Sequence, residues 1–346
     1  MLSRADHNKM SLAGEPSRRA LLRALASASS TLTLGGCASA LSQAGARFDA
    51  ADLSGNPTML VATTRKPIND ARAKPWFGTE RAAKMTVARA RLKPPDDGRF
   101  SLASVGLDDW SLQGIETAPQ IGDVFGMPGA ARDVLIYVHG FNQTFESAVL
   151  DAARLSDGVH FRGETLAFCW PSKAKLLDYG YDRESAMWSR DALEQVFAGL
   201  MASPTTGRIH VVAHSIGTMV TMEALRQIYA RQGAAASERI ASVVFASPDI
   251  DMDVFTSSVE RIGPLAGKIT VVTATNDRAL AVSGWMAGGV ARVGAAEKAE
   301  LKRLGLHVID ATAEGWGIIN HDLFLSNAQV RKVIRRAVDG LPTDGA

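Results

Sequence analysis

The strongest constraint on the fold is a series of apolar runs that alternate with amphipathic segments along most of the chain. Most of these runs are continuous stretches of Val, Ile and Leu, a pattern typical of parallel strands covered on both faces. The runs cover residues 133–141, 165–172, 208–215, 241–250, 268–277 and 306–312. We therefore predict a parallel sheet built from these strands.

Segments with apolar residues at helical spacing lie between or after these strands. They cover residues 147–159, 182–202, 217–233 and 320–340, and Asp182 is expected to cap the second of them. Repeated alternation of strand and helix implies right-handed crossovers. The predicted fold is therefore α/β, a three-layer α/β/α sandwich with a mostly parallel central sheet.

The first part of the predicted domain is less regular. Residues 58–64 and 84–92 predict two early strands, whereas the Gly- and Pro-rich residues 114–133 are expected to form a loop of little regularity. The sequence contains no internal repeat and no sign of a second folded domain. We predict one α/β domain over residues 58–340.

The N-terminal residues have the organisation of an export signal. A polar, basic segment precedes a modestly apolar Ala/Ser/Leu stretch that ends in small residues. Residues 17–23, "SRRALLR", resemble a twin-arginine signal, and residues 34–37, "LGGC", resemble the lipobox of bacterial lipoproteins. We predict a signal peptide over residues 1–36, lipidation of Cys37, and a tether over residues 37–57.

These signals predict a protein of the bacterial cell envelope, anchored to a membrane by lipid on Cys37 and facing the periplasm or the exterior. No apolar run reaches the roughly 18 residues of a membrane-spanning helix. The net charge is +2 with acidic and basic residues interspersed, so we expect no nucleic-acid partner. Cys169 lies in an apolar run and is expected to be a buried thiol rather than a disulfide partner.

The run 208–215 ends in His214 and Ser215, and a helical pattern begins at Gly217. A serine on a sharp strand-to-helix turn projects its Oγ from the carboxyl edge of the sheet, where ligands of α/β folds bind. Small residues two positions before and after it are needed because strand and helix crowd each other, as in the G-x-S-x-G nucleophile elbow. Here the motif is A-H-S-I-G, with Ala213 replacing the first glycine. We predict that Ser215 is a nucleophile; the alternative is a serine that only caps the helix.

A nucleophilic serine needs a base, and the base needs an orienting acid. In α/β folds of this kind the acid and then the histidine follow the serine along the chain. His321 lies just beyond the last strand, and Asp277 ends the run before that strand. We predict a triad of Ser215, Asp277 and His321, with Asp249, at the end of an earlier strand, as the alternative acid.

The oxyanion of such a reaction must be held by backbone N–H groups. One is the amide that follows the nucleophile, that of Ile216. The second is expected from the loop after strand 133–141, where Gly140 permits a close backbone approach and Phe141 would donate.

Together, the segments "HGF" (139–141), "WPS" (170–172), "AHSIG" (213–217), "TNDRAL" (275–280) and "NHDLF" (320–324) resemble the α/β-hydrolase superfamily. They resemble most its bacterial esterase/lipase-like branch of poorly characterised members, once classed as a domain of unknown function. The resemblance covers residues 58–338 and is clearest from Val134 onward. It implies the α/β-hydrolase fold, the triad and the two oxyanion amides.

We therefore predict a serine hydrolase that cleaves a small-molecule carboxylic ester through an acyl-enzyme. Two alternatives stay open: an amide or peptide hydrolase that uses the same residues, and a catalytically idle scaffold or binding protein of the envelope. Tyr179, Tyr181, Trp285 and Met286 are expected to wall an apolar substrate pocket. The histidines lack metal-binding spacing, so we expect no metal and no cofactor.

Overall fold

The computed structural model describes residues 57–68, 71–95, 110–118, 131–274, 277, 280, 283–284, 289–312, 325 and 327–341. All of them belong to the second of the two units into which the chain divides, Ala46–Ala346. The predicted signal peptide, Cys37 and all but the end of the predicted tether lie outside these residues. Within them, no helix is long and apolar enough to cross a membrane.

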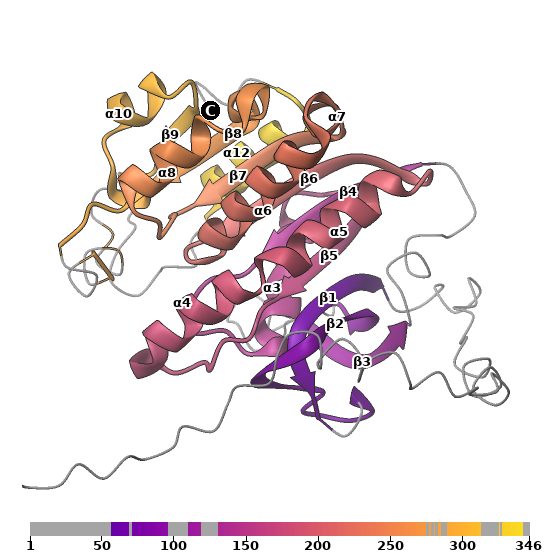
Figure 1. Ribbon diagram of the computed structural model, residues 1–346. Coiled ribbons are helices and arrows are strands. Elements are labelled where there is room, and N and C mark those ends of the chain that lie inside the picture. Colours follow the sequence, from indigo (N-terminus) through magenta and orange to yellow (C-terminus); the bar gives the residue numbers. More distant parts are fainter. Residues whose placement is uncertain are drawn as a thin grey trace, which may run out of the picture. The chain divides into compact units, whose positions relative to one another are not determined.

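Strands from across the described residues join in one nine-stranded sheet (Figure 1), in the order β3-β2-β1-β5-β4-β6-β7-β8-β9. From β1 across to β9 all neighbouring strands run parallel, and β2 and β3 add two antiparallel strands at one edge. The mostly parallel sheet predicted from the apolar runs is confirmed. The strands are β1 Thr58–Pro67, β2 Phe77–Lys93, β3 Ser111–Ala118, β4 Arg132–Val138, β5 Glu164–Cys169, β6 Thr206–His214, β7 Ile240–Ala246, β8 Ile269–Thr273 and β9 His307–Asp310.

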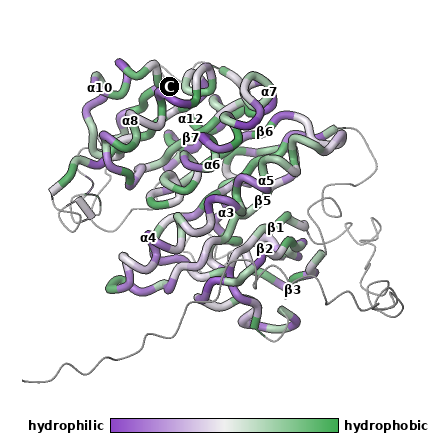
Figure 2. The backbone as a smooth tube through the Cα atoms, in the orientation of Figure 1, coloured by the Kyte–Doolittle hydropathy of each residue, from purple (hydrophilic) through white to green (hydrophobic). Residues whose placement is uncertain are grey.

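Alternate residues of the central strands enter two hydrophobic clusters on opposite faces of the sheet. In β4, Val134, Ile136 and Val138 belong to one cluster, whereas Leu135 and Tyr137 belong to the other. Because both faces are covered, the strand is apolar at every one of these positions. The central strands are accordingly hydrophobic along most of their length, whereas the helices carry hydrophilic residues (Figure 2).

Helices on the two faces complete a three-layer sandwich, as predicted. The first cluster receives side chains from α4 to α8 and from α10, and the second from α3 and α12. The helices are α3 Phe145–Gly158, α4 Tyr179–Trp188, α5 Arg190–Ala202, α6 Gly217–Gln232, α7 Ala234–Arg239, α8 Met252–Val259, α10 Lys298–Arg303 and α12 Ala328–Val338.

The single helix predicted over residues 182–202 is wrong, because α4 and α5 are separate helices that meet at Ser189. The Ser189 hydroxyl donates to the carbonyl of Ser185, 2.8 Å away, and also hydrogen-bonds the hydroxyl of Thr64 in β1. A serine that bonds back to the preceding turn bends a helix. Asp182 therefore does not cap a helix; it lies inside α4 and is fully buried.

The loop predicted over residues 114–133 is also wrong in its first part, because Ser111–Ala118 forms β3 at the edge of the sheet. Leu112 is buried in the second hydrophobic cluster, whereas the neighbouring Gln113 is exposed. This alternation of buried and exposed positions is typical of a strand with one covered face. It is short and includes a glycine, so the Gly- and Pro-rich composition that follows concealed it.

Candidate active site

Ser215 occupies the turn between β6 and α6, in a left-handed backbone conformation with φ +50°. Its N–H donates to the carbonyl of Ala246 at 3.0 Å, and its own carbonyl accepts from Thr218 (3.1 Å) and Asp249 (3.2 Å). A non-glycine residue adopts such a conformation only where its surroundings hold it there. Ser215 thus lies on a sharp, strained strand-to-helix turn at the carboxyl end of β6.

Crowding at this turn explains the glycine two residues after the serine. A Cβ at Gly217 would lie 2.5 Å from the carbonyl oxygen of His139 and 2.6 Å from that of Val138, so only glycine fits. Ala213, two residues before the serine, is fully buried in the first hydrophobic cluster. The departure from glycine at this position is therefore accommodated within the core.

The loop after β4 passes directly against the serine. A Cβ at Gly140 would lie 2.9 Å from the Cβ of Ser215 and 2.7 Å from Nδ1 of His214. The sequence prediction that Gly140 permits a close backbone approach matches this contact. The next residue, Phe141, is half-buried, and its ring meets that of Tyr179 edge-on with centroids 5.4 Å apart.

His139 anchors the start of this loop. Its ring stacks on Trp170 with centroids 4.4 Å apart, and its two ring nitrogens lie 2.8 Å from the Gly140 carbonyl and 3.0 Å from the Trp170 carbonyl. Burial, together with the charge of Arg65, lowers the pKa of His139 to about 3. The imidazole is therefore neutral, donates its one N–H to one of these carbonyls, and is not a base at physiological pH.

Ile216 lies at the start of α6 with helical φ and ψ angles of −57° and −30°. The first N–H groups of a helix have no carbonyl of the preceding turn to bond, and they attract negative charge. The Ile216 amide and the loop at Phe141 therefore approach Ser215 from two elements, α6 and β4. This arrangement fits the stabilisation of an oxyanion formed at Ser215.

Of the other two predicted triad residues, Asp277 and His321, the structure describes Asp277. Asp277 is buried just after β8; its N–H donates to the carbonyl of Ala274 at 3.1 Å, and its Oδ1 accepts from the Leu280 amide at 3.2 Å. His321, Trp285 and Met286 lie outside the described residues.

Asp249, the alternative acid, lies close to Ser215 through its backbone, and its carboxylate is held by three buried side chains. The Tyr179 hydroxyl donates to Oδ2 at 2.8 Å, the Ser283 hydroxyl donates to Oδ1 at 2.8 Å, and Arg292 Nε lies 3.1 Å from Oδ1. Burial, and then the neighbouring Asp249 carboxylate, raise the pKa of Tyr179. The Asp249 carboxylate thus belongs to a buried ion pair with its own set of donors.

The two tyrosines predicted to wall a common pocket have different surroundings. Tyr179 reaches Phe141 and Asp249 at the edge where Ser215 lies. Tyr181 donates instead to the carbonyl of Thr79 in β2 at 2.9 Å, and the cationic groups of Arg81 and Lys173 lie over its ring. The described contacts therefore bring Tyr179, but not Tyr181, to the candidate site.

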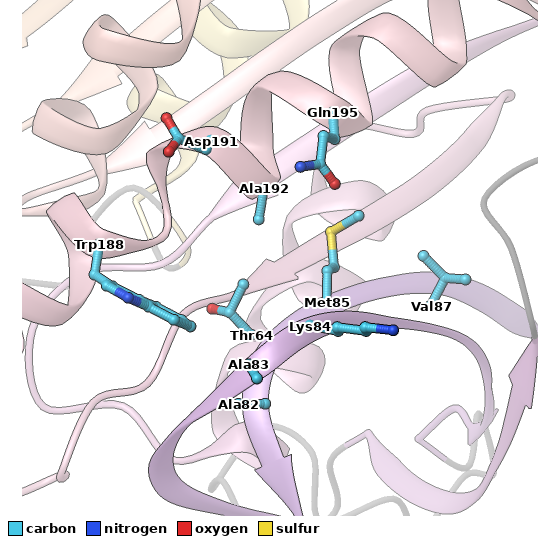
Figure 3. A pocket seen from close by; sticks show the side chains of 10 residues that line it. All are labelled: Thr64, Ala82, Ala83, Lys84, Met85, Val87, Trp188, Asp191, Ala192 and Gln195. Atoms are coloured by element: carbon cyan, nitrogen blue, oxygen red, sulfur yellow. The ribbon is translucent and has the colours of Figure 1, made fainter. Parts of the chain in front are cut away.

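Two cavities among the described residues lie away from Ser215. The larger, of about 560 Å³, opens between β2 and the α4–α5 pair, with Met85 on one side and Trp188 and Ala192 on the other (Figure 3). The smaller, of about 390 Å³, lies at the amino ends of β4 and β6, around Asp133 and Arg208. Neither cavity is lined by Ser215, Phe141 or Ile216.

The described part of the chain contains no cluster of three or more His, Cys, Asp or Glu side chains able to hold a metal ion. Cys169 is a free, fully buried thiol at the end of β5, and burial raises its pKa to about 12. It is therefore a protonated core side chain, as predicted from its apolar surroundings.

A family model of alpha/beta hydrolases of unknown function (DUF900) matches residues 127–337, well over half of the chain. The chain therefore belongs to this alpha/beta hydrolase family, and the resemblance seen in the sequence motifs is confirmed.

A relative from Nostoc sp. (strain PCC 7120), the uncharacterised protein alr1448, is 25% identical over 124 residues, which cover 29% of this chain and 32% of the relative. The chain thus matches about a third of the length of that relative. Among solved structures, a cutinase-like protein from Cryptococcus sp. is 18% identical, covers 62% of this chain and 97% of its own, and has a TM-score of 0.35. Est1E from Butyrivibrio proteoclasticus is 11% identical, covers 74% of this chain and 95% of its own, and has a TM-score of 0.39.

Proposed function

We propose that this alpha/beta hydrolase is a serine esterase that cleaves small carboxylic esters through an acyl-enzyme on Ser215. The observation that carries the proposal is the strained turn of Ser215 at the carboxyl edge of the sheet, packed directly against Gly140. A serine held in this way presents its Oγ beside two converging backbone segments, which is the geometry that acyl transfer needs.

In the proposed reaction, the Ser215 Oγ attacks the ester carbonyl carbon while His321 accepts the hydroxyl proton. The carbonyl oxygen becomes an oxyanion, which the amides of Ile216 and Phe141 stabilise. Collapse of this intermediate breaks the bond to the alcohol, which leaves with the proton from His321. Water, deprotonated by His321, then attacks the acyl carbon of the acyl-enzyme. Collapse of this second intermediate breaks the bond to the Ser215 Oγ, which takes back the proton from His321, and the carboxylic acid is released.

Asp277 is the proposed acid that orients His321. It follows β8, and in the sequence His321 comes after the next strand, β9; the side chain of Asp277 is buried. A buried carboxylate beside an imidazole would hold that imidazole in one tautomer. The contacts of Asp249 support this choice, because its carboxylate already neutralises Arg292 and accepts from two hydroxyl groups. An acid so engaged is poorly suited to a catalytic imidazole.

The proposal is tested by fluorophosphonate labelling of the purified mature protein, followed by mass spectrometry of the labelled peptide. We expect covalent modification at Ser215 and turnover of a series of p-nitrophenyl esters of increasing acyl length. A matched anilide series separates an esterase from an amidase. Absence of labelling at Ser215 would leave the family fold in place and refute the proposed chemistry.

We also propose that the protein is a lipoprotein of the bacterial cell envelope, attached to a membrane through Cys37. The twin-arginine-like and lipobox-like segments support this location, since they occur in the order that export and lipidation require. The full-length protein should partition into the detergent phase, and Cys37→Ala should move it to the aqueous phase. Unchanged partitioning of the variant would rule out the anchor.

A further inference from the structure

Three buried polar side chains from separate parts of the chain hold the loop that follows Phe141. They are Arg65 in β1, Ser172 just after β5, and Asp182 in α4, and all three are almost completely inaccessible to solvent. We call them the loop clamp.

The loop clamp binds the backbone of two consecutive residues. Oδ2 of Asp182 accepts from the Asn142 amide at 3.3 Å. The Ser172 hydroxyl accepts from the Gln143 amide at 3.1 Å and donates to Oδ2 of Asp182 at 2.5 Å. Arg65 donates through Nη2 to the Gln143 carbonyl at 2.7 Å. Both backbone groups of Gln143 and the amide of Asn142 are therefore fixed by side chains.

The clamp also ties this loop to the next one. Oδ1 of Asp182 accepts from the Lys173 amide at 2.8 Å, and Arg65 Nη1 donates to the Ser172 carbonyl at 3.0 Å. The loops after β4 and β5 thus share the same two charged groups. Asp182 and Arg65 therefore link the positions of the two loops.

Asn142 needs such support because its backbone is left-handed, with φ +61°. A non-glycine residue in this conformation is held by its surroundings rather than by its own preference. Phe141 precedes Asn142 and follows Gly140, which is packed against Ser215. Phe141 therefore lies between two fixed peptides, and the direction of its N–H depends on both.

A contribution to the stability of the fold does not explain why Asp182 and Arg65 of the loop clamp are charged residues. Burial raises the pKa of Asp182, although three hydrogen bonds and the charge of Arg65 act in the opposite direction. Burial also lowers the pKa of Arg65, to about 10. Burial therefore disfavours both charged forms, and apolar residues are often at least as stabilising as buried charges at such positions.

We propose that Asp182, acting with Ser172 and Arg65, is a positioning residue that aims the Phe141 amide at the oxyanion formed on Ser215. The inference rests on the proposed esterase function. It assigns to the clamp an effect on the transition state, where the oxyanion exists, rather than on the binding of the ground-state ester.

The test compares Asp182→Asn with Glu194→Gln, a matched acid-to-amide change at a buried carboxylate of α5 that pairs with Arg231. The substrate is a short p-nitrophenyl ester. We expect Asp182→Asn to lower kcat by about 10²-fold, the effect of a misplacement near 1 Å, and to change KM by less than about 3-fold. Glu194→Gln should keep kcat within about 2-fold of the wild type, because the ion-pair partner of Glu194 is Arg231 in α6, which belongs to neither loop.

Ser172→Ala provides a milder second variant, which keeps the proposal testable if Asp182→Asn does not fold. It removes the acceptor for the Gln143 amide and one donor to Asp182, and we expect kcat to fall about 10-fold with KM nearly constant. Wild-type kcat in folded Asp182→Asn, or a loss expressed in KM alone, would overturn the positioning role and leave the esterase proposal intact. A wild-type protein that does not react at Ser215 would overturn both.

Discussion

Ile216 and Phe141, the two proposed oxyanion donors, are positioned by different kinds of interaction. Ile216 follows Ser215, whose N–H bonds to β7 and whose carbonyl accepts from the first turn of α6. These are main-chain hydrogen bonds between regular elements. The position of the Ile216 amide therefore follows from the main-chain bonds at the junction of β6 and α6.

Phe141 has no comparable support from regular structure, because it lies in the loop between β4 and α3. Side chains of Arg65, Ser172 and Asp182 hold the two residues that follow it. The donor on the helix side is thus fixed by the backbone, and the donor on the loop side by a buried polar network. The loop side should therefore be sensitive to substitutions far away in the sequence.

The largest effect is expected from removing the proposed nucleophile, on whose reaction both oxyanion donors act. Ser215→Ala should lower kcat by about 10⁶-fold, as loss of the nucleophile does in triad enzymes. The variant should still fold, because the Ser215 side chain is small and the turn is held by backbone bonds. Ester turnover is measured by stopped-flow or end-point assay, with circular dichroism as the folding control. Near-wild-type turnover would mean that another residue is the nucleophile.

The second effect distinguishes the two buried acids at the strand ends. Asp277→Asn should lower kcat by about 10⁴-fold, because the imidazole of His321 would settle in the wrong tautomer. Asp249→Asn should keep kcat within about 10-fold of the wild type but destabilise the fold by about 3–5 kcal/mol, since it leaves the buried Arg292 without its counter-charge.

Turnover and urea denaturation of the two variants provide the comparison. If Asp249→Asn is inactive and Asp277→Asn is active, the triad acid is Asp249, and Asp277 only caps the turn at Leu280. We expect the opposite result. Asp277→Asn should lose activity and keep its stability, whereas Asp249→Asn should lose stability and keep its activity.

The third effect uses the glycines to disturb the two donors separately. Gly217→Ala would press a methyl group against the carbonyls of His139 and Val138, so it should displace the start of α6 and lower both stability and kcat, the latter by about 10²-fold. Gly140→Ala would press on Ser215 and His214 and should lower kcat by a similar factor with a smaller loss of stability. Kinetics and thermal unfolding distinguish the two outcomes.

Ala213→Gly is the matched control for these glycine variants, since it restores the full G-x-S-x-G motif without adding atoms. It should keep kcat within about 3-fold and cost about 0.5–1 kcal/mol of stability, the usual cost of glycine in a strand. Full activity of Gly217→Ala would show that the crowding at the turn is not needed for catalysis.

The same difference between the two sides explains what the sequence can predict. The sheet, the turn at Ser215 and the approach of Gly140 follow from local patterns: continuous apolar strands, small residues around Ser215, and a glycine just after β4. The sequence predicts that Asp182 caps a helix, because the residues after it have helical spacing. Its actual partners, Asn142 and Ser172, lie in two other loops, and no local pattern connects them.

A signal for the clamp does exist, although it is indirect. Arg65 follows an apolar run that forms a strand beside β5, and a charged residue at the end of a buried strand needs acceptors nearby. The identity of those acceptors depends on how β1 inserts beside β5, which is a long-range feature of the fold. The sequence does not predict the break at Ser189 for the same reason, since the partner of Ser189, Thr64, is in β1.

The smallest expected effect is on the free energy of unfolding, and it tests the charge of Asp182 in the loop clamp. Because burial raises the pKa of Asp182 in the folded protein, the folded state binds a proton more tightly than the unfolded state. The contribution of this carboxyl to stability is therefore largest below its unfolded pKa and is lost as the pH rises through the folded pKa. We compare wild type and Asp182→Asn by urea denaturation from acid to neutral pH. As the pH rises, the free energy of unfolding of the wild type should fall relative to that of Asp182→Asn, and the difference should then level off. A difference that moves the other way would mean that the folded protein lowers this pKa, and the carboxylate would then be a stabilising group rather than one whose charge the fold tolerates to hold the Phe141 loop.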